Sequence, residues 1–78
     1  MTAEHELPFK TVHRLMKKNC ECKVGSDSVE QMIYYLENVI GNVSFYASLY
    51  SEHDNRKTLN SNDVNLAIRY LYNKKDRL

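Results

Sequence analysis

The 78-residue sequence has few residues that break helices or form turns, with one proline, Pro8, and two glycines, Gly25 and Gly41. So few breakers predict few turns, and no segment shows the alternating hydrophobic pattern of a β-strand. No hydrophobic run approaches the roughly 20 residues that a membrane-spanning helix requires. The sequence therefore predicts an all-α protein without a membrane partner.

Cysteine is also scarce, since Cys20 and Cys22 are the only two in the chain. They stand two positions apart, which we take as too close for an ordinary disulfide with each other. The start of the chain, Met1–His5, lacks the basic and then hydrophobic pattern of a secretion signal. These features predict a reducing environment and a cytoplasmic location.

The sequence also lacks a set of metal ligands and a group of catalytic residues. A tetrahedral zinc site takes four ligands, commonly spaced C-x2-C, so the two cysteines with His13 nearby fall short. The sequence shows no nucleophile paired with a base and no glycine-rich phosphate loop. We therefore predict no metal, no cofactor and no enzymatic activity. Without a disulfide or a metal, a single domain (1–78, core about 6–72, short polar ends) needs a second protein chain for stability.

The charges are unevenly distributed, although the net charge is only +1. Residues 1–26 carry a net charge of +2, residues 27–55 carry −5 without a lysine or arginine, and residues 56–78 carry +4. Any anion is expected to bind at the two basic flanks. On charge alone, an ordinary mixed surface explains this pattern equally well.

Three helices follow from the hydrophobic spacing. Hydrophobic residues recur every three or four positions from Pro8 to about 20, again from 27 to about 53, and in a third segment that Asn60 caps. Asn55 is suited to a left-handed helix end, and the tail from Asn73 is polar. At about 1.5 Å per residue the middle helix is roughly 40 Å long. Two short helices are not enough to cover its hydrophobic stripe, so we expect an intertwined homodimer.

This pattern resembles the archaeal histones, a histone-fold family. The resemblance runs without a gap from Glu6 to about Tyr72. Its most specific part is the run Arg56-Lys57-Thr58-Leu59, which follows the long helix, with an aspartate, Asp63, seven residues after the arginine. Supporting positions are Glu6-Leu7-Pro8, Arg14, Val24, His53, Ala67 and Arg69.

The resemblance implies a handshake dimer that grips DNA from its minor-groove side. The DNA contacts it implies are Arg14, which enters the minor groove, and Lys17, Lys23, Lys57 and Thr58, which contact the backbone. Other implied roles are a loop clamp, a dimer–dimer interface and a dimer core. These are assigned to Arg56 and Asp63 (clamp); Tyr50, His53, Asp63 and Leu66 (dimer–dimer interface); and Leu15, Met32, Leu36, Val39, Val43, Ala47, Val64 and Ile68 (dimer core).

The sequence departs from the family pattern at several positions. Lys23 replaces a usual arginine and loses its bidentate geometry. Cys20 stands where the family often has a glycine that lets stacked dimers approach, and Asn55 replaces a loop glycine. The long helix has no lysine or arginine, whereas stacked turns of wrapped DNA use both signs of charge there. These departures predict dimers or tetramers on DNA rather than long superhelices.

The sequence therefore predicts a nucleoid-associated, homodimeric protein that binds double-stranded DNA without sequence preference and bends or compacts it. Its partners are DNA, a second copy of itself and other histones. The alternative is a histone-fold interaction module of a larger complex with little affinity for DNA. The acidic, tyrosine-bearing middle helix favours that alternative.

Overall fold

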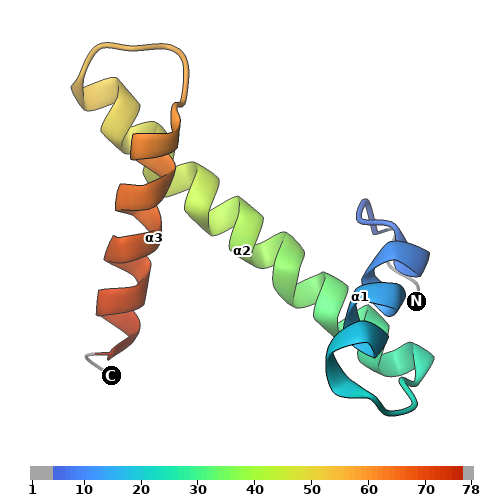
Figure 1. Cartoon of the computed structure of the whole chain (residues 1–78). Helices are drawn as coiled ribbons and strands as arrows, with labels where there is room; N and C mark the ends of the chain where they lie inside the picture. The colour runs from blue at the N-terminus through green and yellow to red at the C-terminus, as the bar shows by residue number, and fades with distance from the viewer. Residues whose placement is uncertain (1–4, 77–78) are drawn as a thin grey trace. The chain divides into compact units, whose positions relative to one another are not determined.

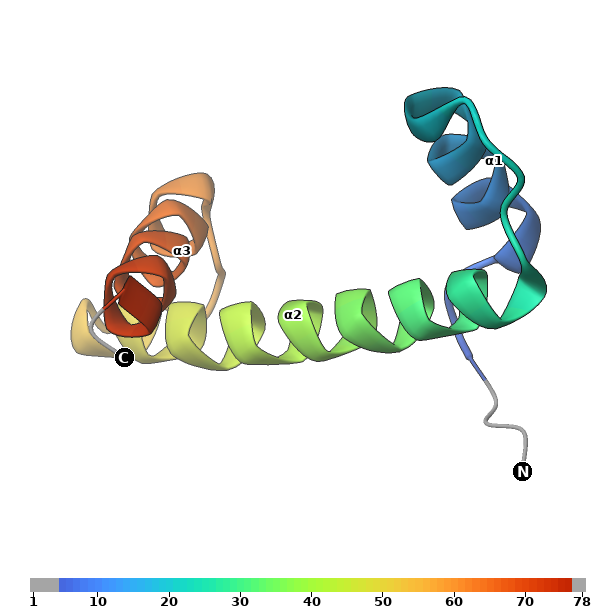
Figure 2. The ribbon, with the colours of Figure 1, turned by 90° about the horizontal axis from the view of Figure 1, so that it is seen from below.

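The computed structural model describes residues 5–76, with side chains through Asn73. This part of the chain forms three helices and no strand: α1 (Phe9–Cys20), α2 (Ser26–His53) and α3 (Ser61–Asp76) (Figures 1 and 2). The predicted all-α order of short, long and short helix is therefore confirmed. The remainder of the predicted polar ends, 1–4 and 77–78, lies outside the described residues.

Helix α1 begins one residue later than predicted. Pro8 has φ −72° and ψ 126°, which is extended, so it precedes the helix as its N-cap instead of forming its first residue. Its carbonyl still accepts the first bond of the helix, from the backbone N–H of Val12 at 3.2 Å. The helix ends at Cys20, because Glu21 turns into the left-handed conformation with φ 55°.

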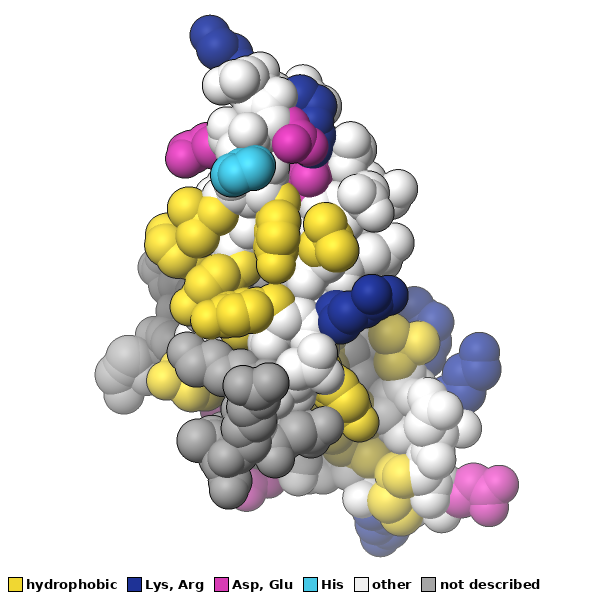
Figure 3. Space-filling model, turned by 90° about the vertical axis from the view of Figure 1, so that its left-hand side faces the viewer, with side chains coloured by type: hydrophobic (Ala, Val, Ile, Leu, Met, Phe, Trp, Pro, Cys, Tyr) yellow, Lys and Arg dark blue, Asp and Glu magenta, His cyan; other side chains and the backbone are white. Residues whose placement is uncertain are grey.

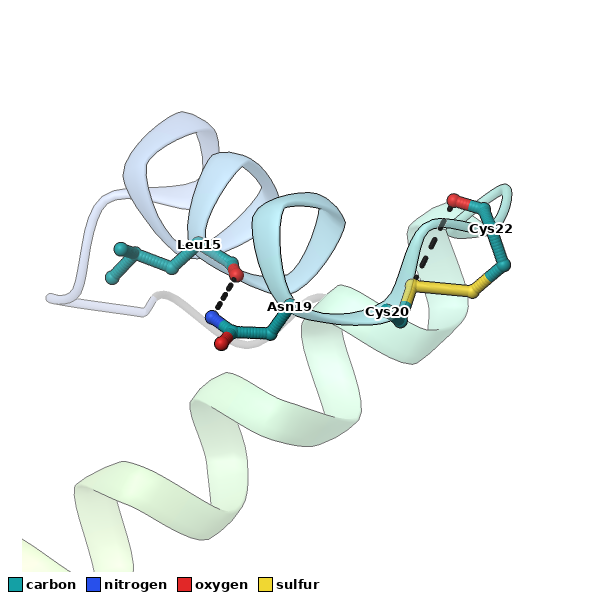
Figure 4. The surroundings of a disulfide bond; sticks show 4 residues. All are labelled: Leu15, Asn19, Cys20 and Cys22. Carbon is teal, nitrogen blue, oxygen red and sulfur yellow. Dashed lines mark hydrogen bonds between the residues drawn. A yellow bond between two sulfur atoms is a disulfide. The ribbon is translucent and has the colours of Figure 1, made fainter.

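The structure joins Cys20 and Cys22 by a disulfide (Figure 4). The expectation that these two residues are too close to pair is therefore wrong. The physical reason lies in the residue between them, Glu21, whose left-handed backbone bends the chain back at the end of α1. The two Cα atoms are consequently 5.3 Å apart, within the range of about 4.4–6.8 Å that disulfides span.

Helix α2 runs without interruption for 28 residues. The carbonyl of Gly25 accepts hydrogen bonds from the N–H groups of Ser28 and Val29 and so begins the helix. At the other end Asn55 adopts φ 60°, which confirms the predicted left-handed turn. Gly41 lies within the helix, and a Cβ atom placed there would meet no atom within 4 Å.

The chain divides into two compact units, residues 1–38 and 39–78. In the first unit α1 packs on the N-terminal part of α2. Its core is the buried trio Val12, Val29 and Ile33, against which Leu7, Met16 and Val24 pack. Burying an aliphatic side chain of this size contributes about 1.5–3 kcal/mol, so these few contacts fix the position of α1 on α2.

In the second unit α3 packs on the C-terminal part of α2. The buried residues there are Ala47, Ser51, Asp63 and Ala67. Alanine and serine occupy little volume, so they let the two helices approach closely. Helix α3 continues to Asp76, so it includes the first residues of the polar tail that begins at Asn73.

Many large hydrophobic side chains stay exposed in both units. In the second unit they gather on the surface that Figure 3 shows, beside acidic and histidine side chains. Of the predicted dimer core only Ala47 is buried in this chain, and Leu15 and Ile68 are 47% and 50% exposed. Met32 is also exposed, and the other members are half-buried: Leu36, Val39, Val43 and Val64.

None of the described helices is both long enough and hydrophobic enough to cross a membrane.

Candidate nucleic-acid interface

The exposed side of α1 carries a row of four cations. Lys10, Lys17 and Lys18 each lie three or four residues from Arg14, which places the four cations along one side of the helix. All four side chains are exposed. Arg14 and Lys17 were predicted from the family resemblance, whereas Lys10 and Lys18 were missed. Their helical spacing from Arg14 was the signal that would have found them.

Lys23 lies in the segment that connects α1 to α2 and is exposed. It belongs to the first unit, as do the four cations of α1. In the part of the chain that the structure describes, none of these five cations forms an ion pair with a carboxylate. Their charge is therefore available to an anion from outside the chain.

The second unit presents its cation on a clamped loop. Both terminal nitrogens of Arg56 donate to the carboxylate of Asp63, with Nη1–Oδ2 at 2.8 Å and Nη2–Oδ1 at 2.7 Å. The same guanidinium donates to Asp54 Oδ2 at 3.1 Å and to the carbonyl oxygen of Thr58 at 3.2 Å. The structure thus brings together Arg56 and Asp63, the two residues predicted to form the clamp.

The clamp continues into the first turn of α3. The side-chain oxygen of Asn60 accepts a bond from the N–H of Asp63 at 3.1 Å, and Asp63 Oδ2 accepts one from the N–H of Asn60 at 3.0 Å. This reciprocal pair is a capping box with aspartate in the place of the usual glutamate. The loop is therefore fixed at its arginine and at the start of the next helix.

Hydrogen bonding perturbs both partners of this ion pair. The bonds from Arg56, and after them the N–H of Asn60, lower the pKa of Asp63 to about 2. Asp63, and after it Asp54, raises the pKa of Arg56 above its ordinary value. Asp63 is only 1% exposed, so its charge depends on these partners rather than on water.

The clamp leaves two neighbouring side chains for contacts outside the chain. Lys57 and Thr58 lie between Arg56 and the start of α3, and both are exposed. Because Arg56 already binds two carboxylates, it is not free for a phosphate. Its role in this loop is to hold the backbone at Thr58, and Lys57 supplies the available charge.

A second polar contact was not predicted from the sequence. Oε2 of Glu37 on α2 accepts hydrogen bonds from the N–H groups of Glu6 and Leu7 at 2.7 and 3.1 Å, and Oε1 lies 3.6 Å from Nδ1 of His5. The bonds from Leu7 and Glu6 keep the pKa of Glu37 below its usual value. They also tie the segment before α1 to α2, which fixes where α1 begins.

The residues predicted to join two dimers all lie in the second unit. Tyr50 and Leu66 are half-buried, and the side chain of His53 is 90% exposed, with its Nδ1 3.9 Å from Asp54 Oδ1. Asp63, the fourth member, is buried and accepts its bonds from within the chain. The structure therefore leaves His53 accessible to another molecule.

The chemistry of these residues suits phosphate. Lysine and arginine side chains and a threonine hydroxyl bind phosphate oxygens, and contacts of this kind carry no sequence information. Among the side chains that the structure describes, up to Asn73, no group of three or more histidine, cysteine, aspartate or glutamate residues is placed to hold a metal ion. The first unit offers a row of exposed cations on α1, and the second offers Lys57 on a loop that hydrogen bonds hold in place.

Two comparisons with known proteins agree with this description. A family model described as histone-like transcription factors (CBF/NF-Y) and archaeal histones matches residues 5–68. The archaeal histone HAN1 of Thermococcus zilligii has a subunit that is 33% identical over 64 residues, which cover 82% of this chain and 96% of that protein. The span matched by the family model begins before α1 and ends within α3, so it includes every candidate residue described above.

Proposed function

Because the chain belongs to the family of histone-like transcription factors and archaeal histones, we propose that it binds double-stranded DNA without sequence preference and bends or compacts it. Proteins of this family are structural proteins that bind or package DNA, so the proposal contains no catalytic step. It places the protein on the chromosome.

The proposed binding form is a homodimer, and the observation that supports it is the exposure of large hydrophobic side chains. Leu15 and Ile68 are about half exposed in the single chain, and so is Ile40 on α2. A chain of 78 residues does not gain enough stability from the few buried residues of its two units. A second copy that covers these side chains supplies the missing core.

The proposed contacts are Arg14, Lys17 and Lys23 in the first unit and Lys57 and Thr58 in the second. Arg14 enters the minor groove, whose negative potential attracts an arginine whatever the base sequence. The others contact phosphates. Since a dimer presents each contact twice, a modest net charge per chain is compatible with useful affinity. We add Lys10 and Lys18, which extend the basic row of α1.

The test is a titration of a duplex of about 60 base pairs at two salt concentrations, for the unchanged protein and for variants. Removing Lys57 with K57A removes two phosphate contacts per dimer, so the slope of log affinity against log salt becomes less steep by roughly 2. The double variant R14A/K57A loses binding and keeps its helical circular dichroism.

Arg69→Ala is the matched control, because Arg69 is an exposed arginine of α3 outside the proposed contacts. This control keeps the affinity of the unchanged protein. Equal affinity of the R14A/K57A variant and the control would show that the proposed contacts are wrong. Failure of the unchanged protein to bind even at low salt would refute DNA binding itself.

A second function is favoured by α2. This helix carries the acids Asp27, Glu30, Glu37 and Glu52 and no lysine or arginine, and Tyr34 on it is 60% exposed. Such a surface suits a component of a protein complex better than it suits proximity to DNA. A chain that is soluble only with a second, different protein would favour this function, whereas a homodimer formed by the purified chain favours DNA binding.

A further inference from the structure

The end of α1 carries a pair of sulfur atoms that the proposed DNA contacts do not use. Cys20 is the last residue of the helix, Cys22 lies two residues later, and the structure joins their Sγ atoms (Figure 4). The Sγ of Cys20 also lies 3.7 Å from the carbonyl oxygen of Cys22. The preceding turn is fixed by Asn19, whose Nδ2 donates to the carbonyl of Leu15 at 2.8 Å. The pair therefore stands at the junction of α1 and the segment that carries Lys23.

The bond closes a small ring around Glu21. This residue has φ 55° and ψ 37°, a left-handed conformation that residues with a Cβ seldom adopt. Its N–H donates to the carbonyl of Lys17 at 3.3 Å. While the bond is closed, the ring restricts Glu21 to conformations close to this one. Once the bond opens, only that hydrogen bond remains, and the backbone after α1 gains access to its commoner conformations.

In the single chain, small thiols have access to these sulfurs. Both cysteines are exposed, and exposed disulfides are the ones that exchange readily with thiols. The attacking species in such an exchange is a thiolate anion. Lys17, Lys18 and Lys23 flank the pair in the sequence, and their positive charge raises the local concentration of an anionic thiol.

We propose that Cys20 and Cys22 form a thiol–disulfide exchange site for an anionic, low-molecular-weight monothiol, and that closing the bond fixes Lys23 in position to contact DNA. The effect on DNA rests on the function proposed above. The closed form is the better DNA binder, because its loop is already ordered before binding.

The exchange proceeds in two steps, through a mixed disulfide between the protein and the small thiol. A thiolate attacks one sulfur of the Cys20–Cys22 bond, that bond breaks, and a mixed disulfide with the monothiol forms. A second monothiol attacks the mixed disulfide and leaves as the oxidised disulfide of the small thiol. Two electrons and two protons have then passed to the protein, which holds two free thiols. The reverse reaction uses the oxidised small disulfide as the oxidant and closes the bond again.

The first test compares the full chain equilibrated with reduced glutathione and with oxidised glutathione. Alkylation and mass spectrometry report the number of free thiols, and the duplex titration at one salt concentration reports the affinity. We expect the reduced form to bind roughly 3- to 10-fold more weakly, since its loop is competent for only part of the time. The variant C20S/C22S binds like the reduced form under both conditions. K23A binds more weakly than the unchanged chain and shows no difference between the two conditions.

A second readout does not depend on DNA. Trypsin cleaves after Lys23, so the rate of cleavage between Lys23 and Val24 reports how ordered this segment is. We expect the oxidised form to be cleaved several-fold more slowly at this bond than the reduced form or C20S/C22S.

The two readouts separate this proposal from the function on which it rests. Equal affinity of both forms for DNA would overturn the coupling to Lys23 while DNA binding itself stands. If neither form binds DNA, the proposed function fails, and the tryptic rate alone decides whether the pair controls the loop. Equal cleavage rates would overturn control of the loop by the bond. An unchanged number of free thiols in reduced glutathione, or a disulfide that joins two chains on a non-reducing gel, would overturn the exchange site.

Discussion

At the scale of single residues, Asp63 shows how much one side chain fixes. Its carboxylate accepts two hydrogen bonds from Arg56 and one from the N–H of Asn60, while almost none of its surface meets water. The same residue therefore orders the loop before α3 and begins α3 itself. The positions of Lys57 and Thr58 therefore depend on Asp63, although their side chains do not contact it.

The variant D63N tests this dependence. The amide keeps the shape of the carboxylate but lacks its charge, so one nitrogen of Arg56 loses an acceptor and the ion pair is lost. We expect the melting temperature to fall by roughly 5–10 °C. Asp54→Asn is the matched control, because Asp54 also binds Arg56 but is exposed, and exposed pairs contribute little. Equal effects of both variants would contradict a special role for Asp63.

The low pKa of Asp63 also predicts how stability depends on pH. The unfolded chain holds this carboxyl at a pKa near 3.9, whereas the folded chain holds it at about 2. The unfolded state therefore binds the proton first, and stability falls as the pH is lowered from about 5 towards 2. Glu37, whose pKa is also lowered, adds in the same direction.

Acid titration of unfolding midpoints in urea, followed by circular dichroism, measures this loss. The unchanged protein and D63N should differ at neutral pH and converge as the pH falls to about 2 and below, where Asp63 of the unchanged protein becomes protonated. A difference that stays constant over this range would show that the charge of Asp63 does not contribute.

The sequence predicts the Arg56–Asp63 ion pair but not the contact between Glu37 and the segment before α1. Arg56 and Asp63 are seven residues apart, the first on the short loop after α2 and the second in the first turn of α3. The family resemblance names both, so their pairing was foreseeable. Glu37 lies 30 residues from Leu7, and its partners are backbone N–H groups that exist in every residue. No side-chain pattern marks such a contact before the helices are placed.

At the scale of helices, the local chemistry of the chain predicts most of the boundaries. The side chain of Asn60 caps the start of α3, and Asn55 adopts the left-handed backbone that asparagine tolerates after a helix. The errors occur at the two ends of α1, one next to a tertiary contact and the other at a local disulfide. Pro8 is extended rather than helical, and it follows a segment whose backbone binds Glu37. The left-handed turn at Glu21 lies between two disulfide-bonded cysteines, a pairing that their spacing in the sequence did not predict.

Gly41 gives a prediction for α2. A Cβ atom at this position meets open space, and alanine is the better helix former, so G41A should stabilise the chain by about 0.5–1 kcal/mol. Urea unfolding at one fixed protein concentration measures the gain. A loss of stability instead would show that another copy of the chain approaches α2 closely at Gly41.

At the scale of the whole molecule, the exposed hydrophobic side chains predict which changes separate the two copies. L15E and I68E place a charge at half-exposed positions of the proposed dimer core, so both should shift the protein from dimer to monomer. Y34E is the control, because Tyr34 is more exposed and lies outside that core. Sedimentation analysis at matched concentrations distinguishes the three variants, and a dimeric L15E or I68E would remove its residue from the interface.

The sequence predicts the class of fold and its three helices, and the family resemblance extends this to a dimer. It does not predict which hydrophobic side chains of α2 a single chain buries by itself. Val29 and Met32 belong to the same hydrophobic stripe of α2, yet the first is buried and the second is exposed in the single chain. Helical periodicity predicts that both are core residues, and it does not distinguish the residue that the single chain buries from the one that it leaves exposed.

The exposure of many large hydrophobic side chains in the single chain has a consequence for the kinetics of folding. If the hydrophobic side chains left exposed by one chain are covered only by another, the rate-limiting step includes an encounter between two chains. Refolding from urea should then follow second-order kinetics, with a half-time that halves when the protein concentration doubles. A newly made chain would reach its stable form at a rate set by how many of its own kind are already present.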